Sequence, residues 1–129
     1  MEMSASGMKA QTKRMQVISQ NIANSESTGL YPDQLPYRRK TIIFGLTKDK
    51  KKGMNLVKVR KIDVDKSNYK IRFDPDHPAA NAQGYVLYPN VDKTVENMDA
   101  KEAQRSYEAN LTSFEISKNM ELKTLDILR

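Results

Sequence analysis

Residues 91–128, VDKTVENMDAKEAQRSYEANLTSFEISKNMELKTLDIL, decide the fold of this chain. The stretch holds no glycine and no proline, and its apolar residues recur at helical spacing. At about 100° per residue they form two stripes on nearly opposite faces of one helix, which is about 50 Å long. One stripe contains Tyr107, Leu111, Phe114, Leu122 and Leu125, and the other contains Val91, Val95, Met98, Ile116, Met120 and Ile127.

A helix on the surface of a monomer needs only one apolar stripe, so two stripes predict packing on both sides. The chain has 129 residues, of which 38% are hydrophobic, and its mean hydropathy is -0.73. Such a small, polar chain has few helices of its own and no large core. We therefore expect part of the helix surface to meet other subunits.

A second helix is predicted over residues 3–24. Met1, Met8, Met15 and Ile22 are spaced seven residues apart, with Ile18 between the last two. This is the spacing of a coiled-coil seam, which we expect to pack on one stripe of the C-terminal helix. Turn-forming residues follow position 24, and Gly29 is the expected C-cap glycine of this region.

The middle of the chain, residues 25–90, holds all five prolines and short β-type runs over residues 41–44, 56–62, 69–73 and 85–88. Alternation of apolar and basic residues predicts one small antiparallel sheet with an apolar inner face and a basic outer face. Asn90 or Asp92 then caps the C-terminal helix. The expected fold class is α+β, with an N-terminal helix (1–24), a β-rich module (25–90) and a long C-terminal helix (91–129).

Catalytic and metal-binding patterns are missing from the sequence. The motif DPDHP at residues 74–78 sets two carboxylates beside the single histidine, but its two prolines favour a rigid turn over a metal site. There are no cysteines and no nucleophile or phosphate-loop motifs. We expect no enzyme activity, cofactor or metal. The chain also lacks an apolar membrane span and a cleavable signal, so no membrane insertion is expected.

The net charge of +6 is concentrated in residues 37–61, where ten basic residues face one acid, so this segment carries +9 and the rest of the chain −3. One interpretation is a small nucleic-acid-binding protein that uses this segment. The alternatives are a solvated loop at residues 50–52 and a basic face that meets an acidic neighbour. The missing recognition motifs make nucleic acid the less favoured partner.

The terminal motifs resemble those of a known family. The runs SASGMKAQ (4–11), RMQVI (14–18) and NIAN (21–24) are similar to the N-terminal signature of bacterial flagellar rod and hook proteins. The match continues through PYRRKT (36–41), HPA (77–79), GYV (84–86) and PNV (89–91). It ends with RSYEAN (105–110), KNM (118–120) and KTLDI (123–127). The resemblance covers nearly the whole chain and is greatest to the basal-body rod proteins of the proximal rod.

This resemblance implies a structural role in motility. Such subunits leave the cell unfolded through the flagellar type III export apparatus. Their paired terminal helices pack against other rod proteins and copies of themselves in a helical tube that crosses the periplasm and carries torque. Twelve residues of the two helices are the expected subunit interface: Met8, Met15, Ile18, Ile22, Tyr107, Leu111, Phe114, Ile116, Met120, Leu122, Leu125 and Ile127.

Overall fold

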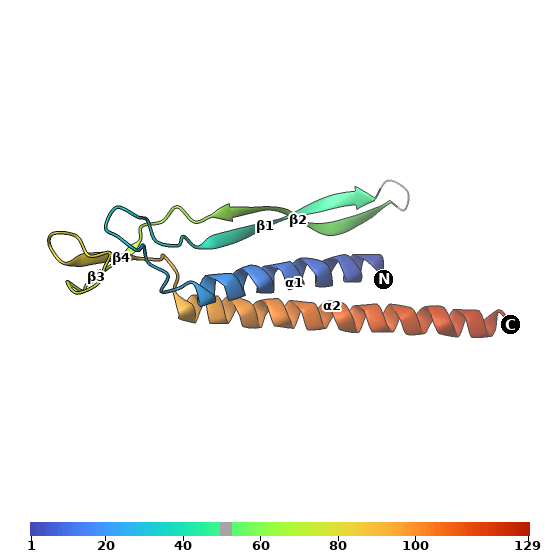
Figure 1. The fold of residues 1–129 in the computed structure, drawn as a ribbon. Coiled ribbons are helices and arrows are strands. Elements are labelled where there is room, and N and C mark those ends of the chain that lie inside the picture. Colours follow the sequence, from blue (N-terminus) through green and yellow to red (C-terminus); the bar gives the residue numbers. More distant parts are fainter. Residues whose placement is uncertain (50–52) are drawn as a thin grey trace. The chain divides into compact units, whose positions relative to one another are not determined.

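The computed structural model describes residues 1–49 and 53–129. Helix α1 spans Glu2–Ala23 and helix α2 spans Lys93–Ile127 (Figure 1). Between them lie strands β1 (Lys40–Asp49), β2 (Met54–Val64), β3 (Lys70–Phe73) and β4 (Tyr85–Tyr88). The predicted α+β class with two long terminal helices and small antiparallel strands is confirmed.

Two compact units divide the chain. We call Met1–Gln16, Ile42–Lys61 and Ala100–Arg129 the arm unit. Val17–Thr41 and Ile62–Asp99 form the module unit. Both helices contribute to both units, and each unit is described by itself below.

Local hydrogen bonds define the helix ends. At the start of α2, the carboxylate of Asp92 accepts a 3.0 Å bond from the Thr94 N–H, which is the geometry of an N-cap. Asp92 is therefore the cap, and Asn90 has a different role. Helix α1 ends in a turn over residues 24–26. The predicted C-cap role of Gly29 is wrong, because positive φ angles occur among the described residues only at Gly53 and Gly84.

The strands form two separate two-stranded sheets, β1–β2 and β3–β4, so the prediction of a single sheet is wrong. In the second sheet the strands run antiparallel with Lys70 opposite Tyr88 and Arg72 opposite Val86. The lengths of the strands give the physical reason for two sheets: β3 and β4 have four residues each and match each other, whereas β2 has eleven residues. A four-residue strand matches only a short part of the longer one.

The predicted apolar inner face of β3 is also wrong. Ile71 and Phe73, expected on the inner face, are 65% and 66% exposed. All four residues of β3 are exposed, and the covered residue of this sheet lies on β4: Val86 is fully buried, and the Arg72 guanidinium lies 4.4 Å above the Tyr88 ring. Lys70 Nζ donates to the Val91 carbonyl at 2.8 Å. The basic side chains of β3 thus contact neighbours through their charged ends, which alternation of residue types does not anticipate. In β2 the prediction is confirmed, since Val57 and Val59 are half-buried and Lys58 and Arg60 exposed.

The core is small in both units, as the composition predicts. In the arm unit, Ala10 and Ala103 are the buried apolar side chains among the described residues. The module unit buries a larger set: Val17, Ile18, Ala79, Val86 and Val91. Many large apolar side chains are left at the surface, which is the property that an assembling subunit requires.

Candidate functional site: the helix faces and their polar anchor

In the arm unit, α1 and α2 pack against each other in antiparallel directions. Gly7 of α1 lies against the side chain of Asn110, where a Cβ on the glycine would meet the amide at 2.7 Å. One heptad further along α1, Arg14 pairs with Glu102 at 3.6 Å. The contacts therefore advance along α1 while they move back along α2. A glycine at the closest point lets the two backbones approach each other.

This register leaves the end of α2 without α1 beside it. If Gly7 faces Asn110, the first residue of α1 faces α2 near position 115. The last three turns of α2 extend past that point, as Figure 1 shows. Apolar side chains on this extension are exposed: Ile116 (54%), Met120 (65%), Leu122 (51%), Leu125 (57%) and Ile127 (83%).

The predicted interface residues fall into three groups by exposure. On α1, Ile18 is buried and Met8, Met15 and Ile22 are half-buried. These last three each follow by one residue the positions that contact α2, about 100° around the helix, so they flank the helix pair. On α2, Tyr107 and Phe114 are half-buried and Leu111 is 36% exposed. The remaining five form the exposed extension.

The two stripes on α2 differ in what they meet. Tyr107, Leu111 and Phe114 lie on the side of the helix that carries the α1 contacts, and Leu122 and Leu125 continue this side past the end of α1. Ile116, Met120 and Ile127 lie about 120–180° around the helix from these residues. Val95 and Met98 on the same second stripe are 45% and 65% exposed, whereas Val91 precedes α2 and is buried.

A buried polar cluster anchors the helices in the module unit. The side chain of Asn21 clamps the backbone of Lys40: its Oδ1 accepts from the Lys40 N–H at 2.9 Å, and its Nδ2 donates to the Lys40 carbonyl at 2.8 Å. Its Oδ1 also accepts from the Tyr37 hydroxyl at 2.8 Å. Asn21 Nδ2 lies 3.4 Å from a carboxylate oxygen of Glu96 on α2. Asn21 thus uses both ends of its amide and links α1, β1 and α2.

Glu96 is fully buried, and its charge is balanced by Arg39. Arg39 Nε donates to one Glu96 oxygen, and the guanidinium also lies 3.3 Å from Asp65 and 3.7 Å from Asp99. Burial lowers the pKa of Arg39, but the hydrogen bonds and charges of Glu96 and Asp65 outweigh it, so the pKa is raised. Burial raises the pKa of Tyr37, and the Glu96 charge adds to that effect.

Asp65 and Asn90 complete the anchor. Hydrogen bonds from Ser67, and then the charge of Arg39, hold the pKa of Asp65 below its ordinary value. Asn90 Oδ1 accepts from the Arg39 N–H at 2.8 Å, and its Nδ2 donates to the Asp65 carbonyl at 3.0 Å. No buried side-chain nitrogen or oxygen among the described residues lacks a hydrogen-bond partner. A fully satisfied buried network of this kind specifies one packing arrangement.

Sequence reasoning on residue types did not find this anchor. Asn21, Arg39 and Asn90 all lie in motifs that carried the family resemblance, NIAN, PYRRKT and PNV. Glu96 lies in the first turn of the helix, where an acid is ordinary, so nothing in its pattern distinguishes it. The motifs were the available signal, and only the fold shows that three of them meet at one point.

The basic segment 37–61 is partly used within the molecule. Arg39 pairs with Glu96 in the buried anchor. The Arg38 guanidinium lies 4.2 Å above the Tyr69 ring and donates to the Asp65 and Ser67 carbonyls at 2.8 and 2.9 Å. Lys58 and Arg60 are exposed. The predicted solvated loop, Lys50–Lys52, lies outside the described residues. Arg38 and Arg39 thus interact with groups of the same chain, and nothing here favours nucleic acid.

The motif at residues 74–78 is a turn, as predicted. The His77 N–H bonds the Asp74 carbonyl at 3.1 Å. His77 Nδ1 accepts from the Ala79 N–H at 3.0 Å, so the neutral ring carries its proton on Nε2, which lies 3.1 Å from Thr28 Oγ1. The histidine therefore connects the turn to Thr28, in the segment that follows α1.

The described residues offer neither a metal site nor a membrane-spanning helix. Within 1–49 and 53–129, no three acidic, histidine or cysteine side chains are grouped so that they could hold a metal ion. In the same ranges, neither helix combines the length and hydropathy that crossing a bilayer requires.

Paired terminal helices with an exposed apolar end define a class of subunits built to assemble, and residues 1–29 match the family model described as "Flagella basal body rod protein". Full-length relatives narrow this class. The flagellar basal-body rod protein FlgC of Agrobacterium fabrum is 41% identical over 128 residues, which cover 99% of this chain and 92% of the relative. FlgC of Bacillus subtilis is 38% identical, with 98% and 95% covered, and FlgC of Salmonella typhimurium is 37% identical, with 98% and 93% covered. The chain belongs to the FlgC family of flagellar basal-body rod proteins, and it is a structural subunit of the rod.

Proposed function

We propose that this subunit enters the rod through the two apolar stripes of α2 together with the flank of α1. The interface residues are the twelve predicted ones, from Met8, Met15, Ile18 and Ile22 on α1 to Tyr107, Leu111 and Phe114 and the exposed extension on α2. One observation carries the proposal. The extension beyond residue 115 exposes large apolar side chains on both sides of the helix, with no part of α1 beside it.

The energetics support an interface here. Covering an exposed Leu, Ile or Met side chain contributes about 1.5–3 kcal/mol. Five such side chains on the extension therefore offer on the order of 10 kcal/mol of gross burial energy. Association costs about 4–15 kcal/mol, and side-chain ordering adds to that cost. Burial of the extension therefore offsets a large part of the cost of association, and it needs no new conformation of the helix.

The proposed arrangement assigns a role to each part of the chain. Residues 1–24 and 91–129 supply the assembly helices, and residues 25–90 supply the β-rich segment between them in the chain. A helix that is apolar on two sides makes different contacts with two neighbours, and head-to-tail contacts that do not close generate a helical tube. Such a tube of proximal-rod subunits surrounds the path of the type III export apparatus and carries torque to the hook.

Met120 gives the most selective test. It is 65% exposed, and α1 does not reach it, so Met120→Asp should change the stability of the isolated chain by less than about 0.5 kcal/mol. We expect the same variant to be missing from purified hook–basal bodies and to abolish swimming. Asn119→Asp adds the same charge to the neighbouring exposed position and off both stripes, and it should be incorporated normally.

Phe114→Asp tests the other stripe. Phe114 is half-buried opposite the beginning of α1, so this variant should block incorporation and also loosen the helix pair while the module unit stays folded. Far-UV circular dichroism of the free chain separates the two effects. Normal motility of both Phe114→Asp and Met120→Asp cells would refute the proposal.

A further inference from the structure

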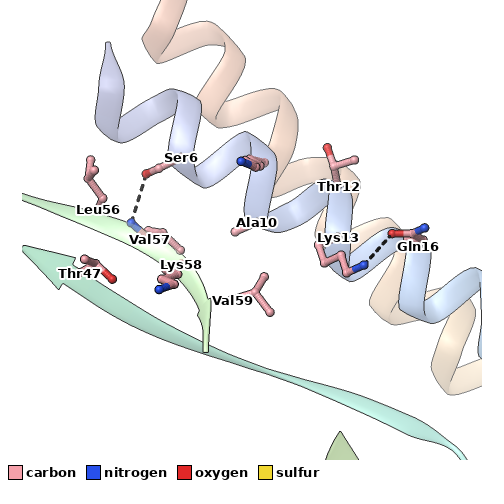
Figure 2. A pocket seen from close by; sticks show the side chains of 11 residues that line it. Ser6, Ala10, Thr12, Lys13, Gln16, Thr47, Leu56, Val57, Lys58 and Val59 are labelled. Atoms are coloured by element: carbon pink, nitrogen blue, oxygen red, sulfur yellow. Dashed lines mark hydrogen bonds between the residues drawn. The ribbon is translucent and has the colours of Figure 1, made fainter. Parts of the chain in front are cut away.

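A groove lies between α1 and strand β2 within the arm unit. It has a volume of about 650 Å³. Figure 2 shows side chains of α1 and of the hairpin facing one another across it. Apolar side chains form the floor of the groove, and lysines lie at its rim.

The floor of the groove is apolar and fixed in place. Ala10 is 2% exposed, and Val57 and Val59 are half-buried. The Val57 N–H donates to Ser6 Oγ at 3.1 Å, and Ser6 Oγ donates to the Met3 carbonyl at 2.8 Å. The bond between Val57 and Ser6, drawn in Figure 2, connects β2 to α1. This contact fixes the position of β2 relative to α1 at one point of the groove.

The rim of the groove is positively charged. Lys9, Lys13 and Lys58 line it, and no carboxylate occurs among its described lining residues. Lys13 Nζ donates to Gln16 Oε1 at 3.2 Å, a neutral partner that leaves its charge unbalanced. The nearby Arg14 is paired with Glu102.

We propose that this groove receives a segment of a different protein in the rod, in which apolar side chains are flanked by Asp or Glu. Apolar groups would cover the floor, and carboxylates would reach the three lysines. Membership in the rod family is the premise that makes a neighbouring polypeptide the occupant. A second copy of this chain fits less well, because its exposed helix end, residues 115–129, carries three acids and three bases. The proposal concerns a surface separate from the stripes of α2.

Photo-cross-linking tests the proposal in assembled rods. The photoreactive residue p-benzoylphenylalanine replaces Val59 on the groove floor, cells are irradiated, hook–basal bodies are purified, and the cross-linked peptide is sequenced by mass spectrometry. We expect a peptide from another rod protein with at least two carboxylates around apolar residues. If the label at Val59 excludes the chain from the rod, Gln16, an exposed lining residue, takes its place.

Charge variants of the rim provide the matched control. The triple variant Lys9→Glu, Lys13→Glu, Lys58→Glu should lower the cross-linking yield by about tenfold, because each attraction becomes a repulsion. The triple Lys→Arg variant should retain the yield. A cross-linked peptide that is neutral or basic, a peptide of this same chain, no peptide at all, or a yield unaffected by charge reversal would overturn the proposal. The same photoreactive residue at Met120 separates the two hypotheses: cross-links at Met120 without any in the groove would refute only the groove.

Discussion

Replacing Glu96 with Gln tests whether the buried anchor holds the module unit together. The Glu96 side chain is 1% exposed, and its two oxygens receive donors from Arg39 and Asn21. A glutamine of the same size has one oxygen and one N–H₂ group, so it can accept from only one of these donors. The other donor then faces an N–H group in a buried site.

The expected loss follows from these contacts. An unsatisfied buried group costs about 1–3 kcal/mol, and the charge-assisted bond to Arg39 contributes about 1.5–3 kcal/mol, part of which Asp65 and Asp99 retain. We therefore expect Glu96→Gln to lower the free energy of unfolding by about 2–3 kcal/mol. For a chain of this length that is a fall in Tm of roughly 10 °C. Urea and thermal unfolding, followed by far-UV circular dichroism, measure it.

Glu102→Gln on the same helix is the matched control. The Glu102 side chain is 67% exposed and lies 3.6 Å from Arg14, a pair worth at most about 1 kcal/mol. The control should shift Tm by no more than about 3 °C. Equal effects of the two substitutions, or a Glu96→Gln protein as stable as the parent, would show that the anchor is not a source of stability.

Three further predictions concern single residues, each measured by unfolding of the isolated chain. Gly84 has φ +85°, and a Cβ there would meet the Phe73 ring at 2.9 Å, whereas Gly53 has φ +67° and no atom within 4 Å of the added Cβ. Gly84→Ala should therefore lower the free energy of unfolding by about 2–3 kcal/mol, and Gly53→Ala should lower it by about 1 kcal/mol. Because the folded-state pKa of Asp65 is lowered, its contribution is full above its unfolded pKa of about 4 and is lost as the pH falls through the folded value; Asp65→Asn should flatten the fall in Tm on acidification, and an unchanged profile would contradict this. Gly7→Leu should separate the helices at Asn110 and cost more than about 2 kcal/mol, while Gly7→Ala in an Asn110→Ala background should gain about 1 kcal/mol from helix propensity.

The sequence predicted the helices well because helix formation is local. The absence of glycine and proline after Val91 and the apolar spacing set α2 within two residues of its observed bounds, Lys93–Ile127. The sheets were less predictable, because alternation shows which residues share a face but not which face is covered. Ile71 and Phe73 are exposed, whereas on the other face Arg72 lies above the Tyr88 ring and Lys70 donates to the Val91 carbonyl.

The candidate site was predictable in part for a similar reason. The stripes on α2 are visible in the sequence as apolar residues at helical spacing. Their exposure beyond the end of α1 follows from the lengths of the two helices. The anchor required the tertiary fold: Asn21, Arg39 and Glu96 are far apart in the chain and meet only when both helices and β1 are in place. Gly7 is a further example, since its value lies in the approach of Asn110.

Thiol accessibility at Met120 distinguishes an assembly surface from an ordinary exposed helix end. The natural chain has no cysteine, so Met120→Cys carries a single thiol that a maleimide reports without background. We predict rapid labelling in the isolated chain and strong protection in intact hook–basal bodies that contain the variant, with labelling restored when the particles are dissociated. Equal labelling of the free chain and of the intact particles would show that α2 does not meet its neighbours through this surface.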